Sequence, residues 1–460
     1  MKLNRYIPLA TLLFAAAGAA SAEVSIHGSV DYTTYGAEQS FTKTDGEAEH
    51  TKASSGYDPD SNYKIDLKAT AQNVEFNLGL YFNSDGNDEE YYDYSDNLHT
   101  PFYQGNIRVG FVDDQVRFYT GKFEDFNAGY IEDGYALGTQ SITNLADKTF
   151  GQYLTGLEFA PRVVKGLKFF AGLPVLPYRG NGVEENFEAN QWKNIYKKAK
   201  YMASYTLPIE LPVTLNAGFR GETHYDGTED YRADSSVERS TNDYMTNYFG
   251  EGFFQAVLPD VSGVALQASY DIRWRDSEYS KTDGTTKEHK AFMHMATVGA
   301  EFGGLISDYV QLAAEDRFYY AGDDYIHSDE KLIYDILAVT GEVKIAASPF
   351  SVGGVLAGMY AVDARGTAFS DDGGAKVSSE SCFDSDVGMS LADMTTASVD
   401  GLTGKSTTYM GCYANPYVKV NLPNGYLKAG VEFNYTLFKN DDIENQGMSY
   451  RIPVGIIYNF

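Results

Sequence analysis

The sequence predicts an all-β chain that forms a transmembrane antiparallel β-barrel of about eighteen strands, with sixteen as the alternative count. Three observations predict this fold. Segments in which apolar and polar residues alternate recur along the whole chain. The joints between these segments are alternately short and long. The polar face of the segments carries too many charged side chains for a dry core.

The first twenty-two residues have the features of an export signal. Lys2 and Arg5 give a positive start, an apolar run follows from Ile7 to Ala20, and Ala20-Ser21-Ala22 is a small-x-small cleavage site. We therefore expect 1–22 to be a cleaved signal peptide. We expect 23–460 to be a single barrel with no separate plug or soluble domain, because alternation begins directly after Ala22.

Alternation defines the strands in order. Near the start, Val24, Ile26 and Val30 share one face, and the closing stretch MSYRIPVGIIYNF keeps one apolar face to its last residue. The same pattern occurs in YKIDLKA, VEFNLGLYF, NIRVGF, VTLNAGFRGETH and VALQASYDIRWR. The predicted strands are 24–36, 62–71, 74–83, 105–112, 115–123, 153–160, 167–175, 194–207, 213–225, 244–258, 264–280, 287–303, 309–321, 331–346, 350–364, 407–422, 426–439 and 448–460. The least regular patterns are those of 153–175 and 194–207.

The joints sort into two classes. The short ones include Gln72-Asn73, Asp113-Asp114, Pro259–Gly263 and Pro423–Gly425. The long ones are acidic and include 37–61, 84–103 and 124–152, of which 84–103 holds six acidic side chains and no Lys or Arg. Tight turns should therefore collect at one end of the strands and long joints at the other. An even number of strands places both chain ends beside the short turns.

A closed sheet with lipid outside and water inside suits both faces of these strands. Closure leaves no unpaired backbone edge in hydrocarbon, and an apolar exterior with a polar lumen is typical of such barrels. By parity, the charged residues expected on the lumen face are Lys64, Asp66, Lys68, Glu75, Arg108, Arg117, Arg220, Asp271, Arg273, Glu432 and Arg451.

The C-terminal strand resembles the sorting signal of Gram-negative outer-membrane barrels, which ends on Phe and has apolar residues at alternate positions before it. The matching residues are Ile452, Val454, Ile456, Tyr458 and Phe460. The resemblance implies recognition by a barrel-assembly machinery and a location in the outer membrane, in contact with lipid and lipopolysaccharide. The start, SIHGSVDYTTYG, resembles the first strand of general porins through Gly28 and Asp31. That resemblance implies a homotrimer around water-filled channels for small hydrophilic solutes.

The porin resemblance also implies that the third long joint folds inward and narrows the lumen. Its acidic residues would then face basic residues on the wall and create a crosswise field. The acidic candidates are Glu124, Asp125, Glu132, Asp133 and Asp147, and the basic candidates are Lys64, Lys68, Arg108, Arg117 and Arg451. In the alternative, the acids coat a surface loop and the basic residues pair locally with wall carboxylates.

Charge and cysteine content set further limits. The formal net charge is −28 and becomes −30 when Lys2 and Arg5 leave with the signal peptide. This excludes nucleic acid as a favoured partner and favours cations. No cofactor and no specific metal site are expected, although acidic stretches such as 84–93 would hold divalent cations loosely. Cys382 and Cys412 either form a disulfide, as exported proteins favour, or remain two unpaired thiols.

The function predicted from the sequence is passive diffusion through a cation-leaning outer-membrane channel. No catalytic motif is present, so no enzymatic activity is expected. Two alternatives remain open. One is a channel specific for a sugar or an amino acid, and the other is a surface adhesin or receptor whose acidic loops bind a partner on a barrel scaffold.

Overall fold

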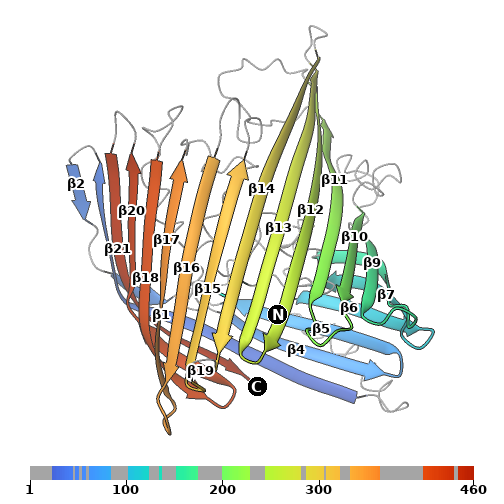
Figure 1. Ribbon diagram of the computed structural model, residues 1–460, viewed down its shortest axis with the longest axis horizontal. Coiled ribbons are helices and arrows are strands. Elements are labelled where there is room, and N and C mark those ends of the chain that lie inside the picture. The colour runs from blue at the N-terminus through green and yellow to red at the C-terminus, as the bar shows by residue number, and fades with distance from the viewer. Residues whose placement is uncertain are drawn as a thin grey trace, which may run out of the picture.

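In the computed structural model, the chain forms one antiparallel sheet that closes on itself (Figure 1). The structure describes residues 23–44, 47–50, 54–57, 62–83, 102–123, 134–136, 152–174, 199–227, 244–280, 286–304, 307–321, 332–362, 408–439 and 444–460. These residues contain no helix long and apolar enough to cross a membrane.

The strands of the sheet pair antiparallel with their neighbours. They are β1 (Glu23–Thr44), β2 (Glu47–His50), β3 (Ser54–Tyr57), β4 (Asn62–Ala71), β5 (Val74–Asn83), β6 (Phe102–Phe111), β7 (Val116–Phe123), β8 (Gln152–Phe159), β9 (Leu167–Pro174), β10 (Lys200–Thr206), β11 (Thr214–Gly227), β12 (Tyr244–Val261), β13 (Val264–Ser280), β14 (Thr286–Gly303), β15 (Val310–Ala321), β16 (Leu332–Lys344), β17 (Phe350–Val362), β18 (Thr408–Leu422), β19 (Gly425–Gly430), β20 (Glu432–Lys439) and β21 (Glu444–Asn459).

Some strands lie end to end and together occupy a single place in the order of strands around the barrel, which we call a wall position. β2, β3 and β4 lie end to end along β1, where they pair in turn with Phe41–Thr44, Thr34–Glu38 and Glu23–Asp31. β19 and β20 lie end to end between β18 and β21 and are separated by Val431 alone. Among the described residues the wall therefore has eighteen positions, and the pairing of β1 with β21 closes it. The predicted strand count is confirmed.

The short joints turn within a few residues because several of them contain left-handed residues. Gln72, Asp113, Ser262 and Ala347 all have φ between 52° and 57°. Both ends of the described barrel lie beside such turns. Glu23 pairs with Thr70 next to the β4–β5 turn, and the Asn459 N–H donates to the Asn424 carbonyl in the β18–β19 turn at 2.8 Å.

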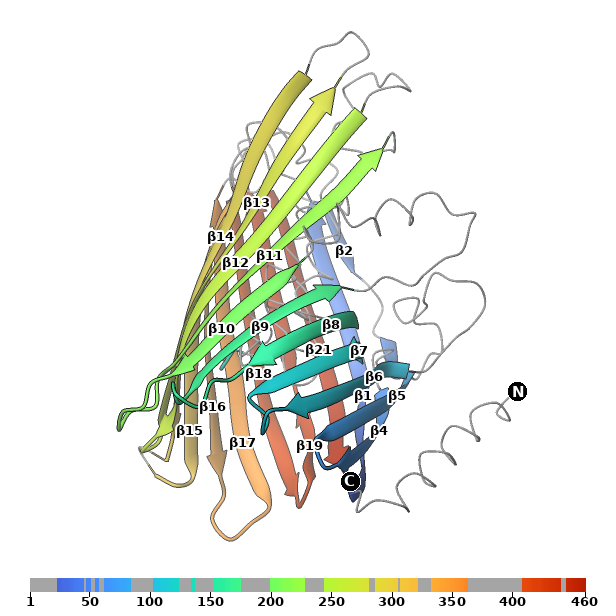
Figure 2. The ribbon, with the colours of Figure 1, turned by 90° about the vertical axis from the view of Figure 1, so that its right-hand side faces the viewer.

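The barrel wall is uneven in height. Figure 2 shows β11–β14 rising beyond the other strands, while β4–β9 run more obliquely across the barrel. β12 and β14 each contain 18 residues, whereas β8 contains 8. Because a bilayer needs about 9–11 residues of tilted strand, β12–β14 extend past the thickness of a membrane.

The first long joint was predicted wrongly. Most of 37–61 is paired backbone, because β1 continues to Thr44 and meets β2 and β3. The register shifts between Tyr35 and Glu38, so the alternation on which the prediction depended is broken there. Smaller differences occur where β6 starts at Phe102 and β21 at Glu444. Residues 194–198 of the predicted eighth strand lie outside the described residues.

The two faces of the wall have opposite character, as predicted. On the outer face, Leu337, Val298 and Leu356 are 54%, 62% and 66% exposed. On the inner face, Asn216, Gln255 and Glu432 are each 0% exposed. A sheet with apolar side chains outside and polar ones inside requires an apolar surrounding medium. Two outward carboxylates, Asp316 and Asp335, are exceptions on the β15–β16 surface.

Candidate channel interior

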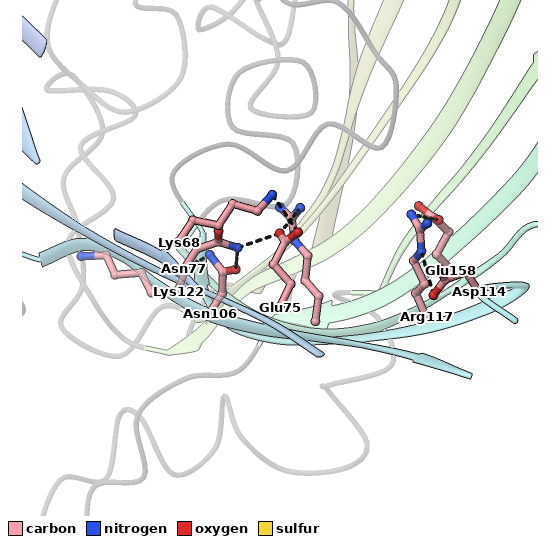
Figure 3. Close-up of polar contacts among 9 residues, drawn as sticks. Lys68, Glu75, Asn77, Asn106, Asp114, Arg117, Lys122 and Glu158 are labelled. Atoms are coloured by element: carbon pink, nitrogen blue, oxygen red, sulfur yellow. Dashed lines mark hydrogen bonds and ion pairs between the residues drawn. The ribbon is translucent and has the colours of Figure 1, made fainter. Parts of the chain in front are cut away.

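Strands β4, β5 and β6 carry a charged group on the inner face, which we call the Glu75 cluster (Figure 3). Lys68 Nζ lies 2.8 Å from one Glu75 carboxylate oxygen, and Arg108 Nη1 lies 3.0 Å from the other. Asn77 donates to Glu75 at 3.0 Å and also to Asn106 at 3.0 Å. The tight β4–β5 turn brings Lys68 and Glu75 together, since Lys68 pairs with Asn77 across the hairpin. The five residues of the Glu75 cluster are Lys68, Glu75, Asn77, Asn106 and Arg108.

The Glu75 cluster faces solvent and holds two cations against one carboxylate. The exposed side-chain fractions are 47% for Lys68, 37% for Arg108 and 22% for Glu75. A water-exposed excess of one positive charge can attract an anion or the negative end of a dipolar solute.

The other predicted basic residues have different surroundings. Arg117 lies 3.5 Å from Glu158 and 3.9 Å from Asp114 (Figure 3). Lys64 lies over the Tyr81 ring at 5.8 Å. Arg451 is opposite Glu432 on β20 and opposite Glu38 on β1 in the strand register. Lys68, Arg108 and Arg117 thus have wall carboxylates as partners. The predicted acidic residues Glu124, Asp125, Glu132, Asp133 and Asp147 lie outside the described residues.

The third long joint is described at Gly134–Ala136, and this segment lies against β14 and β15. The Ala136 N–H donates to Glu315 Oε2 at 3.0 Å. The Tyr135 ring lies beside Gly299, where an added Cβ would be 2.9 Å from the ring. β15 is eight pairing steps from β7 in a wall of eighteen positions. Gly134 therefore lies almost across the barrel from Phe123.

The inner face of β16–β20 carries a second set of polar contacts. Glu342 Oε2 accepts from Lys419 Nζ at 3.2 Å and from the Tyr417 hydroxyl at 3.1 Å. Lys419 lies 4.3 Å from the centre of the Tyr426 ring, and Lys428 lies 4.2 Å from that of Tyr417. Lys419 and Lys428 are directly opposite each other in the ladder. The aromatic rings and Glu342 therefore offset the repulsion between two facing ammonium groups.

The sequence prediction missed an apolar cluster on the inner face of β7–β12. Its members are Tyr119, Phe123, Leu154, Phe170, Met202 and Phe253, each 5% exposed or less. The Tyr119 and Phe170 rings meet edge to face at 6.1 Å. The signal was present, because VRFYTGKF and LKFFAGLP are apolar on both faces. Strands buried on both faces lose strict alternation, which explains why 153–175 had an irregular pattern.

The terminal strand closes the wall. Ile456 and Tyr458 pair with Tyr32 and Val30 of β1, and Ile452 and Val454 are each 39% exposed on the outer face. The Phe460 N–H donates to the Gly28 carbonyl at 2.8 Å, and the Gly28 N–H donates to that of Phe460 at 2.8 Å. The residues of the predicted assembly signal thus form the outer surface of the seam.

Cys412 has an exposed free thiol in the structure. It lies on β18 between Gly358 and Tyr435 of the neighbouring strands. The thiol of Cys412 lies on the outer face of the wall, and the predicted disulfide with Cys382 stays a prediction. Cys382 itself lies outside the described residues. The described residues contain no group of three or more His, Cys, Asp or Glu placed to hold a metal ion.

Comparison with known proteins gives structural likenesses only. No family model matches the chain, and no curated protein matches its sequence. Among solved structures, it is similar to an anion-selective porin from Comamonas acidovorans, with 10% identity, a TM-score of 0.42, and 95% of this chain and 100% of that chain covered. It is also similar to OpdQ of Pseudomonas aeruginosa, with 9% identity, a TM-score of 0.38 and coverage of 96% and 98%. The trimer form of OmpT, an outer membrane protein of Vibrio cholerae, matches with 9% identity, a TM-score of 0.37 and coverage of 95% and 99%. The barrel of this chain is established by its own strand pairing.

Proposed function

We propose that the chain forms a water-filled channel in the outer membrane of a Gram-negative bacterium and passes small hydrophilic solutes passively. The observation that carries this proposal is the sidedness of a closed sheet. Leu356 is 66% exposed on the outer face, whereas the charged Glu75 cluster lies on the inner face. Lipid outside and water inside satisfy both faces.

The path of solutes is proposed to follow the β4–β6 side of the bore. Lys68 and Arg108 are 47% and 37% exposed there, whereas Glu315 and Arg317 on the far wall are 0% and 1% exposed. The third joint contacts that far wall through Ala136. Solutes would therefore pass between the joint and the Glu75 cluster, with the acidic residues of the joint opposite the basic residues of the wall.

The channel is proposed to lean toward cations. The wall clusters are nearly balanced, since Glu75 offsets one of two cations and Glu342 pairs with Lys419. The negative charge of the chain is concentrated in the long joints, and 84–101 alone holds six acidic residues and no Lys or Arg. Acidic joints around an entrance raise the local concentration of cations and of loosely held divalent ions.

Recording currents from the purified protein in planar bilayers tests the function. We expect stable ohmic steps and, in a salt gradient, a zero-current potential with the sign of cation preference. A protein that inserts without conducting would overturn the channel and favour the surface-receptor alternative. A potential of anion sign would overturn the charge argument, and saturable block by one sugar or amino acid would replace passive diffusion with a specific channel.

We also propose that the chain assembles as a homotrimer, as the porin resemblance implies. Molecular mass measured by light scattering in detergent should then correspond to three chains of 50.8 kDa less their signal peptides. A mass of one chain at the concentrations used for conductance would contradict the trimer and leave the channel proposal untouched.

A further inference from the structure

We propose that Gly28 is the seat of the Phe460 ring, and that these two residues form a lock on the outer side of the seam between β1 and β21. This inference concerns how the closed wall is held shut, and it goes beyond the proposed channel function. Two observations carry it. They are the backbone hydrogen bonds that join the two residues and the place of the Phe460 side chain.

The backbones of Gly28 and Phe460 are bonded in both directions. The Phe460 N–H donates to the Gly28 carbonyl, and the Gly28 N–H donates to the Phe460 carbonyl, each at 2.8 Å. On the other side of β21, the Asn459 N–H donates to the Asn424 carbonyl at 2.8 Å. This end of β21 is therefore fastened to both of its neighbours, and Gly28 supplies both bonds on the β1 side.

The Phe460 ring lies directly on Gly28. A Cβ on Gly28 would overlap the ring, and it would also lie 3.0 Å from the Lys64 carbonyl oxygen of β4. Gly28 is buried, whereas Phe460 is 60% exposed. The ring thus covers the glycine on one side and is open to the surroundings of the barrel on the other. Because the Lys64 carbonyl belongs to the sheet and has no room to turn aside, a side chain at position 28 must displace the ring.

The same arrangement occurs on the inner face of the wall. Gly218 is directly opposite Phe253, and Gly353 is directly opposite Tyr417. A Cβ on either glycine would collide with the ring of its cross-strand partner. An aromatic ring that covers a cross-strand glycine is a known means of stabilising a sheet. The seat at Gly28 differs because it lies on the outer face and joins the first and the last strand of the wall.

The position of the lock in the seam gives it a mechanical role. From Glu23 to His27, β1 pairs with β4 alone among the described residues, whereas from Ser29 onward it also pairs with β21. Opening of the seam should therefore start at Gly28, since terminal hydrogen bonds fray most easily. A ring seated on the glycine shields both terminal hydrogen bonds from competing water and so slows this opening.

The lock can be separated from the predicted assembly signal. A signal depends on residues of β21 and acts while the protein is inserted, whereas the lock also depends on Gly28 of β1 and acts in the finished barrel. The tests therefore use protein refolded from urea into lipid vesicles, where no assembly machinery is present. A barrel that closes but does not conduct would overturn the proposed channel function and leave the lock intact.

The first test is amide hydrogen exchange of the folded barrel, followed by mass spectrometry. Gly28→Val should speed exchange in 24–30 and 452–460 about tenfold or more, the factor expected for loss of a hydrogen bond and its packing. Gly105→Val is the matched control. Gly105 also lies on the outer face, neither glycine has a positive φ, and a Cβ on Gly105 would meet only Leu78, at 3.9 Å. The control should leave exchange in both segments unchanged, and equal exchange in the parent and both variants would overturn the inference.

The second test asks whether the ring and the glycine act together, and it uses smaller changes in case Gly28→Val does not refold. Gly28→Ala and Phe460→Ala should each speed exchange at the seam several-fold. In the double variant no ring remains to be displaced, so exchange should be no faster than with Phe460→Ala alone. Effects that multiply in the double variant would show that the two residues act independently, and would overturn the lock.

Discussion

Replacing Leu356 by Arg tests whether the outer face meets lipid. Leu356 is six residues from the start of β17 at Phe350 and is 66% exposed. At about 3.3 Å per residue and a tilt of about 40°, it lies roughly 15 Å above the short-turn end. The apolar band of such barrels is about 25 Å tall, so Leu356 is near its middle. Its cross-strand neighbours, Val339 and Ala414, offer no counter-charge.

An Arg at this depth should lower the free energy of unfolding by about 2–4 kcal/mol. Leu211→Arg is the matched control, because Leu211 is 50% exposed in the short joint between β10 and β11, where water can reach it. There the same substitution should change the free energy by about 0.5 kcal/mol or less. Urea titrations of both variants folded into lipid vesicles measure the difference. Equal free energies for the two variants would refute the assignment of the outer face to lipid.

Three further predictions concern other parts of the wall. Glu75→Gln leaves Lys68 and Arg108 without their carboxylate, so the zero-current potential should move toward anion preference. The cation-to-anion permeability ratio should change by at most about fivefold, because the interaction of two unit charges 4 Å apart in water is worth ~1 kcal/mol. An unchanged potential would mean that solutes do not pass this cluster. Asp316→Leu removes an outward carboxylate beside Val298 and Leu337. The midpoint of urea unfolding should rise, by the equivalent of about 1–2 kcal/mol in the free energy of unfolding. A lower midpoint would show that Asp316 has a partner in the assembled membrane. Deletion of Phe460 removes the two 2.8 Å backbone hydrogen bonds to Gly28. The amount of folded barrel recovered from membranes, measured by its heat modifiability in gels, should fall several-fold. Undiminished recovery would contradict the role of Phe460 in assembly.

The parts of the fold predicted well from the sequence are those with one strict physical constraint. β13 and β5 have their predicted limits, Val264–Ser280 and Val74–Asn83, because apolar and polar residues alternate along both segments. The end of β1 was missed because Glu38–Thr44 continues past the register shift at Tyr35, where alternation stops while backbone pairing goes on.

The candidate site was predicted less completely. Parity placed Lys68, Arg108 and Glu75 on one face, and the β4–β6 ladder brings them together. The contact of Ala136 with Glu315 joins residues 179 positions apart, and nothing local in either segment marks it. The apolar inner cluster was missed because Tyr119 and Phe170 share strands with lipid-facing Phe118 and Phe169. A residue type alone does not distinguish the two apolar environments.

The seam between β1 and β21 has a consequence for biosynthesis. The Thr34 hydroxyl donates to the Val454 carbonyl across 420 residues at 3.3 Å, and Ser29 pairs with Asn459. The ring cannot be completed until the ribosome has released the final residues. Until then, the hairpins formed earlier have an edge strand with unpaired backbone N–H and C=O groups, and such an edge is prone to aggregation. Until β21 pairs with β1, these edges must therefore be kept from pairing with other chains.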